Sequence, residues 1–501
     1  MKSIFVNAPK PPKGVRFYGN LLLALSLICL LLLILISFLK PKAKETPEAV
    51  LTSETTATES QTRPSAASPR SIRDPLMAKK VESFFGPLPE EPEIIAPLND
   101  VYPVRGIYLG QAAPDDLEAA LSLARKTEIN AFVIDVKESW GLCYQSQVPL
   151  AVEMSASSGT LDLQKIFKRC HDEGIYVIAR VVCFKDEVMS EKRPDLCIRD
   201  ASGALLHFPL EGELSFASPY QKDVWQYFID IAREVHRLGA DEIQFDYIRF
   251  PTGQASSETP PFFGEGDVPD REYAINRFLE TAVLELQEKE GVPVTADLFS
   301  IVLTSPQDGK AIGQNWNTIG LTGLHAICPM IYPSHYANAS YGSQGNGVGS
   351  YIGNDFFEAP DLRPYDVVIN AIMDGGNAAR QRGYARLRPW LQAFTASYLP
   401  EGYYAEYGPE EIRAQISACY RMGIHEWLLW NASHRYPEAA FLDKAEGNAQ
   451  MEELRRARES ILQEREQLPE QPTESSRHFP IATAPETLPA LTGDAPGLFQ
   501  P

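Results

Sequence analysis

Acidic side chains stand at or near the ends of three apolar, β-rich runs of this 501-residue chain. They are Asp135, Asp246 and Asp297. Side chains alternate across a strand, so Asp135 is expected to share a face with Lys137. If these faces point inward, three carboxylates from different strands meet near one axis. A protonated carboxyl and a carboxylate anion are what glycosidic-bond cleavage requires. Asp135, Asp246 and Asp297 are therefore the candidate catalytic residues.

Polar and aromatic side chains accompany these acids at the ends of the runs. Sugar rings present apolar C–H faces to aromatic side chains, and their hydroxyls bind charged and amide groups. The candidates for substrate binding are Lys137, Glu138, Arg180, Arg249, Tyr332, Gln392, Trp430 and Asn431. A structural role is the alternative for any one of them, such as a buried ion pair of Arg180 with Asp135 or Asp246. Asp246 is expected to be the most critical, because it ends the central run.

The elements that would position these residues lie between residues 98 and 466. Eight apolar runs cover residues 104–110, 131–139, 176–184, 242–250, 293–300, 325–333, 388–394 and 426–433. Amphipathic stretches between them predict helices over residues 114–128, 162–173, 220–238, 271–289 and 409–422. This alternation predicts an α/β protein with a (β/α)8 TIM barrel, whose sites lie at the carboxyl ends of the strands. A doubly wound sheet is the alternative, but neither a GxGxxG nor a P-loop motif follows any run.

The flanking segments predict a membrane anchor. After a short N-terminal segment, residues 1–20, Leu21–Leu39 contains nineteen residues without a charge, which suffices to span about 30 Å of hydrocarbon. Residues 40–97 are rich in Ser, Thr and Pro and predict a disordered linker, and residues 467–501 predict a disordered Pro-rich tail. We expect a single-pass cell-membrane protein with an extracytoplasmic barrel. A cleaved signal peptide is the alternative.

Composition and motif spacing argue against several other classes of protein. The chain has 46 Lys and Arg residues against 66 Asp and Glu residues, a formal net charge of −20. Nucleic-acid binding is therefore not expected, because phosphates need clustered cations. The seven cysteines form no CxxC pair, and the eight histidines form no HxH motif. We expect neither a metal nor a cofactor; a metal-dependent hydrolase using His325, His335 and His434 is the rival enzyme class.

Five phrases, in this order, carry a resemblance to a known family: VRGIYLG, NAFVIDVKESWG, YVIARVVCFKD, QFDYIRFP and CPMIYPSHY. They resemble a bacterial family of glycoside-hydrolase-like proteins with a TIM-barrel domain, and the resemblance covers roughly residues 101–435. It implies a barrel fold and a glycosidase reaction, without naming the sugar.

A more distant similarity concerns the family-18 chitinases. Residues 330–332 and Trp430 are similar to the strand-six and strand-eight positions of that family. Its strand-four acids are matched by Asp246 but not by Gln244 and Ile248, which stand where a second acid and the catalytic Glu would be. Chitinase-style substrate-assisted catalysis is therefore not implied.

The sequence as a whole predicts a membrane-anchored glycoside hydrolase. It would cleave a cell-wall or extracellular polysaccharide by carboxylate acid–base chemistry. The alternative is a non-catalytic glycan-binding barrel held at the membrane. Residues 185–219, a long excursion between a strand and its helix, are predicted to shape the glycan cleft.

Overall fold

The structure is a computed structural model that describes residues 69–340 and 346–466. The predicted N-terminal segment, the apolar stretch Leu21–Leu39 and the tail from residue 467 lie outside these residues. Within the described ranges, every helix is too short or too polar to cross a membrane.

Eight parallel strands of the described chain close into a barrel. Each pairs with its neighbour, and β1 pairs with both β15 and β2, which closes the ring. The strands in barrel order are β1 (Arg105–Tyr108), β2 (Ala131–Glu138), β5 (Tyr176–Val182), β7 (Glu242–Asp246), β9 (Val294–Phe299), β10 (Ala326–Ile331), β14 (Trp390–Gln392) and β15 (Trp427–Trp430). Each predicted run contains one of these strands, so the predicted (β/α)8 barrel is confirmed.

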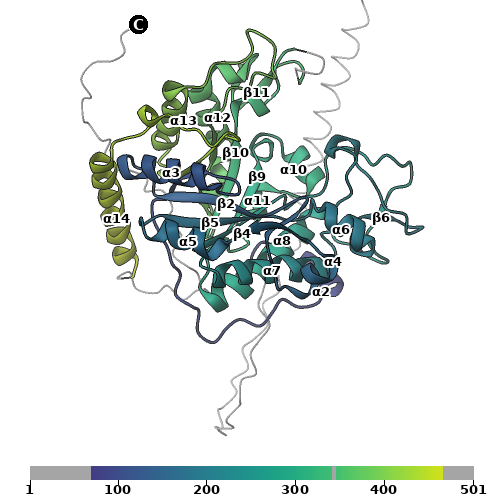
Figure 1. Cartoon of the computed structure of the whole chain (residues 1–501). Helices are drawn as coiled ribbons and strands as arrows, with labels where there is room; N and C mark the ends of the chain where they lie inside the picture. The colour runs from purple at the N-terminus through teal and green to yellow at the C-terminus, as the bar shows by residue number, and fades with distance from the viewer. Residues whose placement is uncertain (1–68, 341–345, 467–501) are drawn as a thin grey trace, which may run out of the picture. The chain divides into compact units, whose positions relative to one another are not determined.

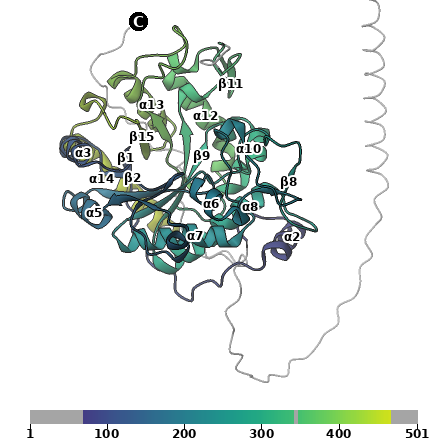
Figure 2. The same cartoon turned by 45° about the vertical axis from the view of Figure 1, so that its right-hand side comes forward.

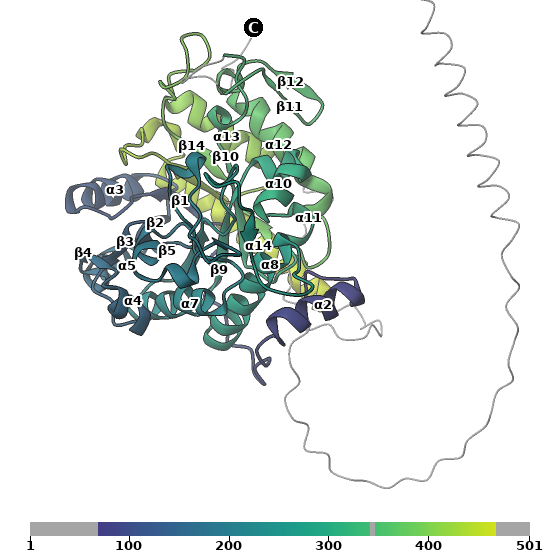
Figure 3. The ribbon, with the colours of Figure 1, turned by 90° about the vertical axis from the view of Figure 1, so that its right-hand side faces the viewer.

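Helices surround the strands, as Figures 1 and 3 show. The predicted ones are α3 (Pro114–Lys126), α5 (Leu163–His171), α7 (Lys222–Arg237), α8 (Arg271–Ala282) with its π-helical continuation η3 (Val283–Glu288), and α13 (Pro409–Arg421). Local chemistry sets their ends: the Asp162 side chain caps α5 by accepting from the Lys165 N–H, and Pro114 and Pro409 begin α3 and α13.

Several short elements had no sequence prediction. They are α4 (Pro149–Met154), α6 (Glu187–Lys192), α9 (Ile301–Thr304), α10 (Pro306–Ile312), α11 (Trp316–Ile319), α12 (Pro364–Ala379), β13 (Arg386–Leu387), and the pairs β3 (Gly141–Tyr144) with β4 (Ser157–Leu161), β6 (Arg199–Asp200) with β8 (Pro261–Phe262), and β11 (Ser350–Ile352) with β12 (Asp355–Phe357). Most follow the carboxyl ends of barrel strands, where they build up the rim of the barrel.

Alternation along the strands divides the apolar side chains between two cores. In β2, Val133 faces the barrel interior together with Ile178, Cys328 and Trp390. The intervening Ile134 belongs to the larger core between the strands and the helices. This period of two is what places every second residue of a strand on the barrel axis.

Residues 69–97 are ordered against the barrel, so the predicted disordered linker is wrong over this range. Asp74 caps α2 (Pro75–Phe85), which buries Val81 and Phe85. Upstream, the Ser71 hydroxyl and backbone N–H both donate to the Glu280 carboxylate on α8. The polar composition of this segment had suggested a flexible chain. A few apolar residues at helical spacing are nevertheless enough to pack the segment against the barrel.

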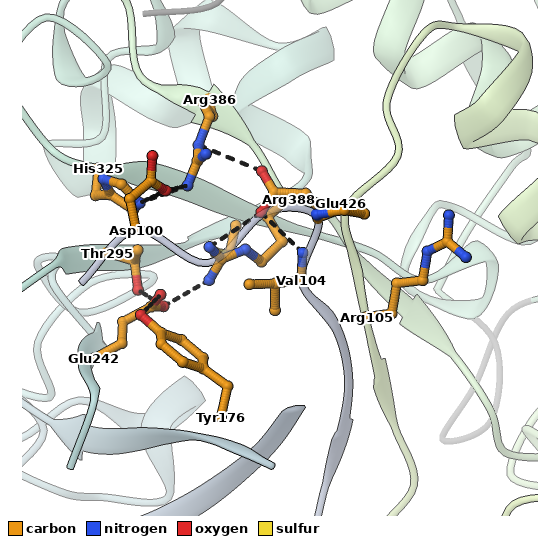
Figure 4. A network of polar contacts seen from close by, with 12 residues as sticks. Asp100, Val104, Arg105, Tyr176, Glu242, Thr295, His325, Arg386, Arg388 and Glu426 are labelled. Atoms are coloured by element: carbon orange, nitrogen blue, oxygen red, sulfur yellow. Dashed lines mark hydrogen bonds and ion pairs between the residues drawn. The ribbon is translucent and has the colours of Figure 1, made fainter. Parts of the chain in front are cut away.

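The amino ends of the strands carry a buried network of ion pairs, drawn in Figure 4. Arg388, fully buried, donates to Glu242 at 2.6 Å and to Glu426 at 3.3 Å. Thr295 donates to the same Glu242 carboxylate at 2.8 Å. These paired charges form a floor for the barrel, on the end where TIM barrels carry stability and not chemistry.

Helix α14 (Lys444–Glu466) covers this floor. Its Arg458 pairs with Asp100 at 2.5 Å, and its Gln450 accepts from Arg105 at 2.7 Å. In Figure 1, α14 and β6 lie on opposite sides of the strands. The carboxyl ends of the strands therefore form the end of the barrel that remains for a substrate.

Candidate active site

Arg180, on the inward face of β5, organises the carboxylates at the carboxyl ends of the strands. Its Nη1 donates to Asp135 at 2.6 Å and to Glu138 at 2.9 Å. Its Nε and Nη2 donate to one oxygen of Asp246, at 3.0 and 2.6 Å. Its Nε also lies 4.0 Å from the Asp297 carboxylate. The three acids singled out in the sequence thus surround one guanidinium.

Asp297 has a different environment from the other acids. Its Oδ1 accepts a hydrogen bond of 2.7 Å from the indole N–H of Trp390. Its Oδ2 is buried and has no hydrogen-bond partner among the described residues. Burial and the nearby Asp246 carboxylate raise the pKa of Asp297 well above its usual range. This environment favours the protonated form of Asp297 over its anion.

The number of charges indicates that at least one of these acids is protonated. Four carboxyl groups, those of Asp135, Glu138, Asp246 and Asp297, share the one guanidinium of Arg180. If all four were ionised, the largely buried cluster would hold three excess negative charges. Excess buried charge is costly, so a protonated member is favoured. Burial also raises the pKa of Glu138, although Arg180 opposes the shift.

Aromatic side chains line the opening above the acids. Trp430 stacks on Tyr108 with ring centroids 6.0 Å apart and lies 6.2 Å from Tyr332. Tyr108 and Trp430 are partly exposed, whereas Tyr332 is buried. The Tyr108 hydroxyl donates to Asp135. Rings beside acids offer both an apolar surface for a sugar face and groups for its hydroxyls.

Lys137 does not share the face of Asp135, which corrects the prediction that the two side chains point the same way. A β-bulge between Asp135 and Lys137 shifts the register and turns the lysine outward. There Lys137 is fully buried and pairs with Asp186 at 2.9 Å, over the Phe228 ring of α7. It joins the barrel to the excursion after β5 and cannot reach a substrate.

Three further substrate-binding candidates already bind other groups of the protein. Arg249 is buried, pairs with Glu211 at 2.8 Å and lies over the Phe299 ring. The Gln392 amide accepts from Ser334 and donates to Asp361 and to a backbone carbonyl. The Asn431 amide donates to the carbonyls of Ala393 and Arg435 and accepts from Ser433. All three side chains hold loops at the rim of the barrel. They do so by binding polar groups of these loops, which need hydrogen-bond partners when they are buried.

Sequence reasoning missed Tyr108 and Trp390, which bind the acids directly. Both lie on strands that were predicted, but Tyr108 contacts the neighbouring strand β2 and Trp390 reaches past β10 to β9, so no local pattern marks them. It also missed Tyr247, whose φ of 52° is left-handed and whose N–H donates to Asp246 at 2.5 Å. Such a backbone costs about 1–3 kcal/mol in a non-glycine residue and tends to occur at functional sites. Here it fixes the orientation of the Asp246 carboxylate.

The three histidines considered as ligands of a metal-dependent hydrolase lie at three separate places. His325 pairs with Asp100 near the floor, His434 pairs with Asp116, and His335 packs against Tyr332. Among residues 69–340 and 346–466, no three His, Cys, Asp or Glu side chains are grouped as metal ligands.

Comparison with solved structures returns a hypothetical protein, a glycoside hydrolase domain and a spore cortex-lytic enzyme, all with TM-scores below 0.5. A hypothetical protein from Ruminiclostridium thermocellum ATCC 27405 is 37% identical over 38% of this chain and 96% of its own, with a TM-score of 0.33. The glycoside hydrolase domain of PgaB (BpsB) from Bordetella bronchiseptica is 12% identical over 67% of this chain and 96% of its own, with a TM-score of 0.47. The spore cortex-lytic enzyme SleL of Bacillus megaterium QM B1551 is 12% identical over 72% and 80%, with a TM-score of 0.40. No curated protein matches the chain.

The family assignment comes from a family model and not from these structural similarities. The model described as "Putative glycosyl hydrolase domain" matches residues 106–436, which span β1 to the end of the barrel. The match covers more than half of the chain and agrees with the resemblance seen in the sequence. The chain belongs to this family of glycosyl hydrolase domains.

Proposed function

We propose that this chain hydrolyses glycosidic bonds of a cell-wall or extracellular polysaccharide at the carboxyl end of its barrel. The observation that carries the proposal is the cluster of four carboxyl groups around Arg180, in which the Asp297 carboxyl is held apart from the guanidinium. Glycoside cleavage needs a proton donor and an anion on opposite sides of one bond. This cluster contains both kinds of group within one network.

Asp297 is the general acid in this proposal. Its Oδ2 has no hydrogen-bond partner among the described residues, and in this proposal it donates the proton to the glycosidic oxygen of a bound substrate. Trp390 holds the other oxygen and so sets the direction in which the proton points. As the bond to the leaving sugar breaks, the Asp297 proton moves to the leaving oxygen.

Asp246 supplies the anion. It accepts two hydrogen bonds from Arg180 through Oδ2 and one from the Tyr247 backbone through Oδ1, which hold the carboxylate in place. A fixed carboxylate at this place stabilises the positive charge that develops at the anomeric carbon. Asp135 and Glu138 bind the far side of Arg180 and hold it between the acids.

Reducing-end release from defined polysaccharides tests the proposal. The full chain is incubated with a panel of cell-wall and exopolysaccharide fragments, and new reducing ends are measured. We expect release from at least one polysaccharide, and loss of this release in Asp246→Asn and in Asp297→Asn. Binding to a fragment that is never cleaved would instead support the non-catalytic glycan-binding barrel.

The membrane anchor and the extracytoplasmic position of the barrel remain part of the proposal. Their support is the uncharged stretch Leu21–Leu39 and the Ser/Thr-rich segment that follows it. A tether of this kind would hold the barrel beside the polysaccharides outside the cell membrane.

A further inference from the structure

A cavity of about 270 Å³ lies beside the catalytic strand, away from the carboxylate cluster. One wall comes from the excursion after β5, through Phe208, and the other from the segment after β7, through Phe250, Gln254 and Phe263. It lies next to the β6–β8 pair, and β8 is labelled in Figure 2. The cavity is large enough for one pyranose ring, and three of its side chains are aromatic.

Arg271 gives this cavity a positive charge without a matching acid. Its guanidinium lines the cavity, stacks 5.1 Å from the Phe250 ring and donates to the Ala311 carbonyl at 2.6 Å. No carboxylate of the described residues forms an ion pair with it. Glu258 also lines the cavity but is exposed and stands at its edge. Burial lowers the pKa of Arg271, and the nearby Tyr220 opposes this shift.

The position of Arg271 in the helix adds to this positive charge. Arg271 is the first residue of α8, and the preceding Asp270 makes no side-chain capping bond. The amino end of a helix carries a partial positive charge, so a cation there is disfavoured and an anion is favoured. Asp270 and Glu272 flank Arg271 at this end of the helix, and the half-buried guanidinium of Arg271 lines the cavity where an anion can bind it.

We propose that this cavity binds an acidic sugar, a pyranose ring that carries a carboxylate, as a recognition subsite for the polysaccharide. The guanidinium binds a carboxylate in a bidentate manner, and the aromatic rings contact the apolar face of the sugar. Gln254 and Thr259 offer hydrogen-bonding groups for its hydroxyls. This subsite rests on the proposed function, because it selects the class of polysaccharide that the barrel cleaves.

The chain itself connects the cavity with the catalytic cluster. Phe250 lies four residues after Asp246, and between them Arg249 is clamped by Glu211 of the excursion. The same two segments that form the cavity are thus held together directly beside the end of β7. A polysaccharide with one acidic unit in the cavity would have its neighbouring units beside this strand end.

Ligand-observed NMR titration of the full chain tests the subsite without any need for hydrolysis. The probes are methyl β-D-glucuronide and methyl α-D-galacturonide, each compared with its neutral methyl glucoside or galactoside. We expect at least one acidic probe to bind about 10-fold more tightly than its neutral partner. Arg271→Gln should remove this difference. Arg199→Gln, which alters a second cavity on the other side of the β6–β8 pair, should preserve it.

The outcomes separate this inference from the proposed function. Equal binding of the acidic and neutral probes by the wild-type chain would overturn the subsite, and so would a loss caused by Arg199→Gln instead of Arg271→Gln. Arg271-dependent binding without cleavage of any polysaccharide would support the subsite and contradict the hydrolase. Cleavage of a polysaccharide by a chain that shows no preference for acidic probes would support the hydrolase and contradict the subsite. A circular dichroism melt of Arg271→Gln that matches the wild type shows that the variant is folded.

Discussion

A single guanidinium decides how the acids of this barrel differ from one another. Arg180 gives two hydrogen bonds to Asp246 and one each to Asp135 and Glu138, whereas it lies 4.0 Å from Asp297. Paired carboxylates are stabilised as anions, and a buried unpaired one is not. The division between a proton donor and an anion therefore follows from the reach of one side chain.

Asp297→Asn is expected to lower turnover about 10²–10⁴-fold on natural polysaccharide, because the leaving sugar is no longer protonated. The amide still accepts from Trp390, so the local structure is preserved. On aryl glycosides of the cleaved sugar, the loss should shrink as the leaving group becomes more acidic, since a good leaving group needs no proton. Steady-state kinetics over a series of leaving groups measures this.

Asp246→Asn serves as the contrasting variant. Its loss of activity should not depend on the leaving group, because the anion acts at the anomeric carbon. If both variants respond alike to the leaving group, the roles given to the two acids are wrong. Asp308→Asn, at an exposed position on α10, controls for a general effect of removing an acid.

The pH dependence of kcat/KM should show the raised pKa of Asp297. Proton donation requires the protonated form, so activity is present below the pKa of Asp297 in the folded protein and is lost as pH rises through it. The alkaline limb should therefore lie well above the usual carboxyl range. Asp297→Asn should abolish this limb. A wild-type profile that falls near pH 4 would contradict the assignment.

At the scale of elements, two buried ion pairs hold the ends of the barrel. The floor pair of Arg388 with Glu242 and Glu426 joins β7 to the segments that enter β14 and β15. The rim pair of Arg249 with Glu211 joins the end of β7 to the excursion after β5. Neither pair contacts the carboxylate cluster. The loss of either pair should therefore change the stability of the chain or the shape of the cleft more than the rate of the chemical step.

Arg388→Met should lower the free energy of unfolding by about 3–5 kcal/mol, because it leaves Glu242 and Glu426 buried with one partner fewer. Urea denaturation measures the change. The exposed Arg421→Met at the end of α13 is the control and should change stability by less than about 0.5 kcal/mol. If Arg388→Met is no less stable than this control, the floor network does not stabilise the barrel.

Glu211→Gln should destabilise the chain by about 1–3 kcal/mol at neutral pH. Against the effect of burial, Arg249 and Thr252 lower the pKa of Glu211 to about 2. A lowered pKa stabilises the folded state above the unfolded value of about 4.3, and this contribution is lost as pH falls through about 2. The difference in stability between wild type and variant should therefore shrink between these two pH values.

Thermal melts from pH 7 to pH 2 measure that difference. Glu191→Gln, at an exposed position on the same excursion, controls for the loss of an acid and should show little change at any pH. A difference that is constant with pH would mean that the Glu211 contribution is not its ion pair with Arg249.

At the scale of the whole molecule, the barrel presents one covered end and one open end. Helix α14 covers the floor through Arg458 and Gln450, and the excursions after β5 and β7 build up the opposite end. Residues 69–97 contain α2 and precede β1, so any anchor upstream would be joined to an ordered segment. The polysaccharide would enter only at the open end.

Cell fractionation tests the proposed anchor. The full chain should sediment with membranes and resist extraction by high salt, whereas a chain that begins at residue 69 should not sediment, because Leu21–Leu39 supplies the apolar length needed to span a bilayer. Protease treatment of intact cells should digest the barrel if it lies outside. A protected barrel in cells whose surface proteins are cleaved would contradict the extracytoplasmic position.

The sequence by itself determined the barrel and the approximate ends of five of its helices, because periodicity and helix-end residues are local signals, and it singled out Asp135, Asp246 and Asp297, whereas α12 and α14 went unpredicted. Only the tertiary structure decided what each polar residue does. A bulge of one residue turned Lys137 away from the axis, and distant partners engaged Arg249, Gln392 and Asn431. Whether a polar side chain faces a substrate or a buried partner depends on contacts between segments far apart in the chain, and no local pattern records them.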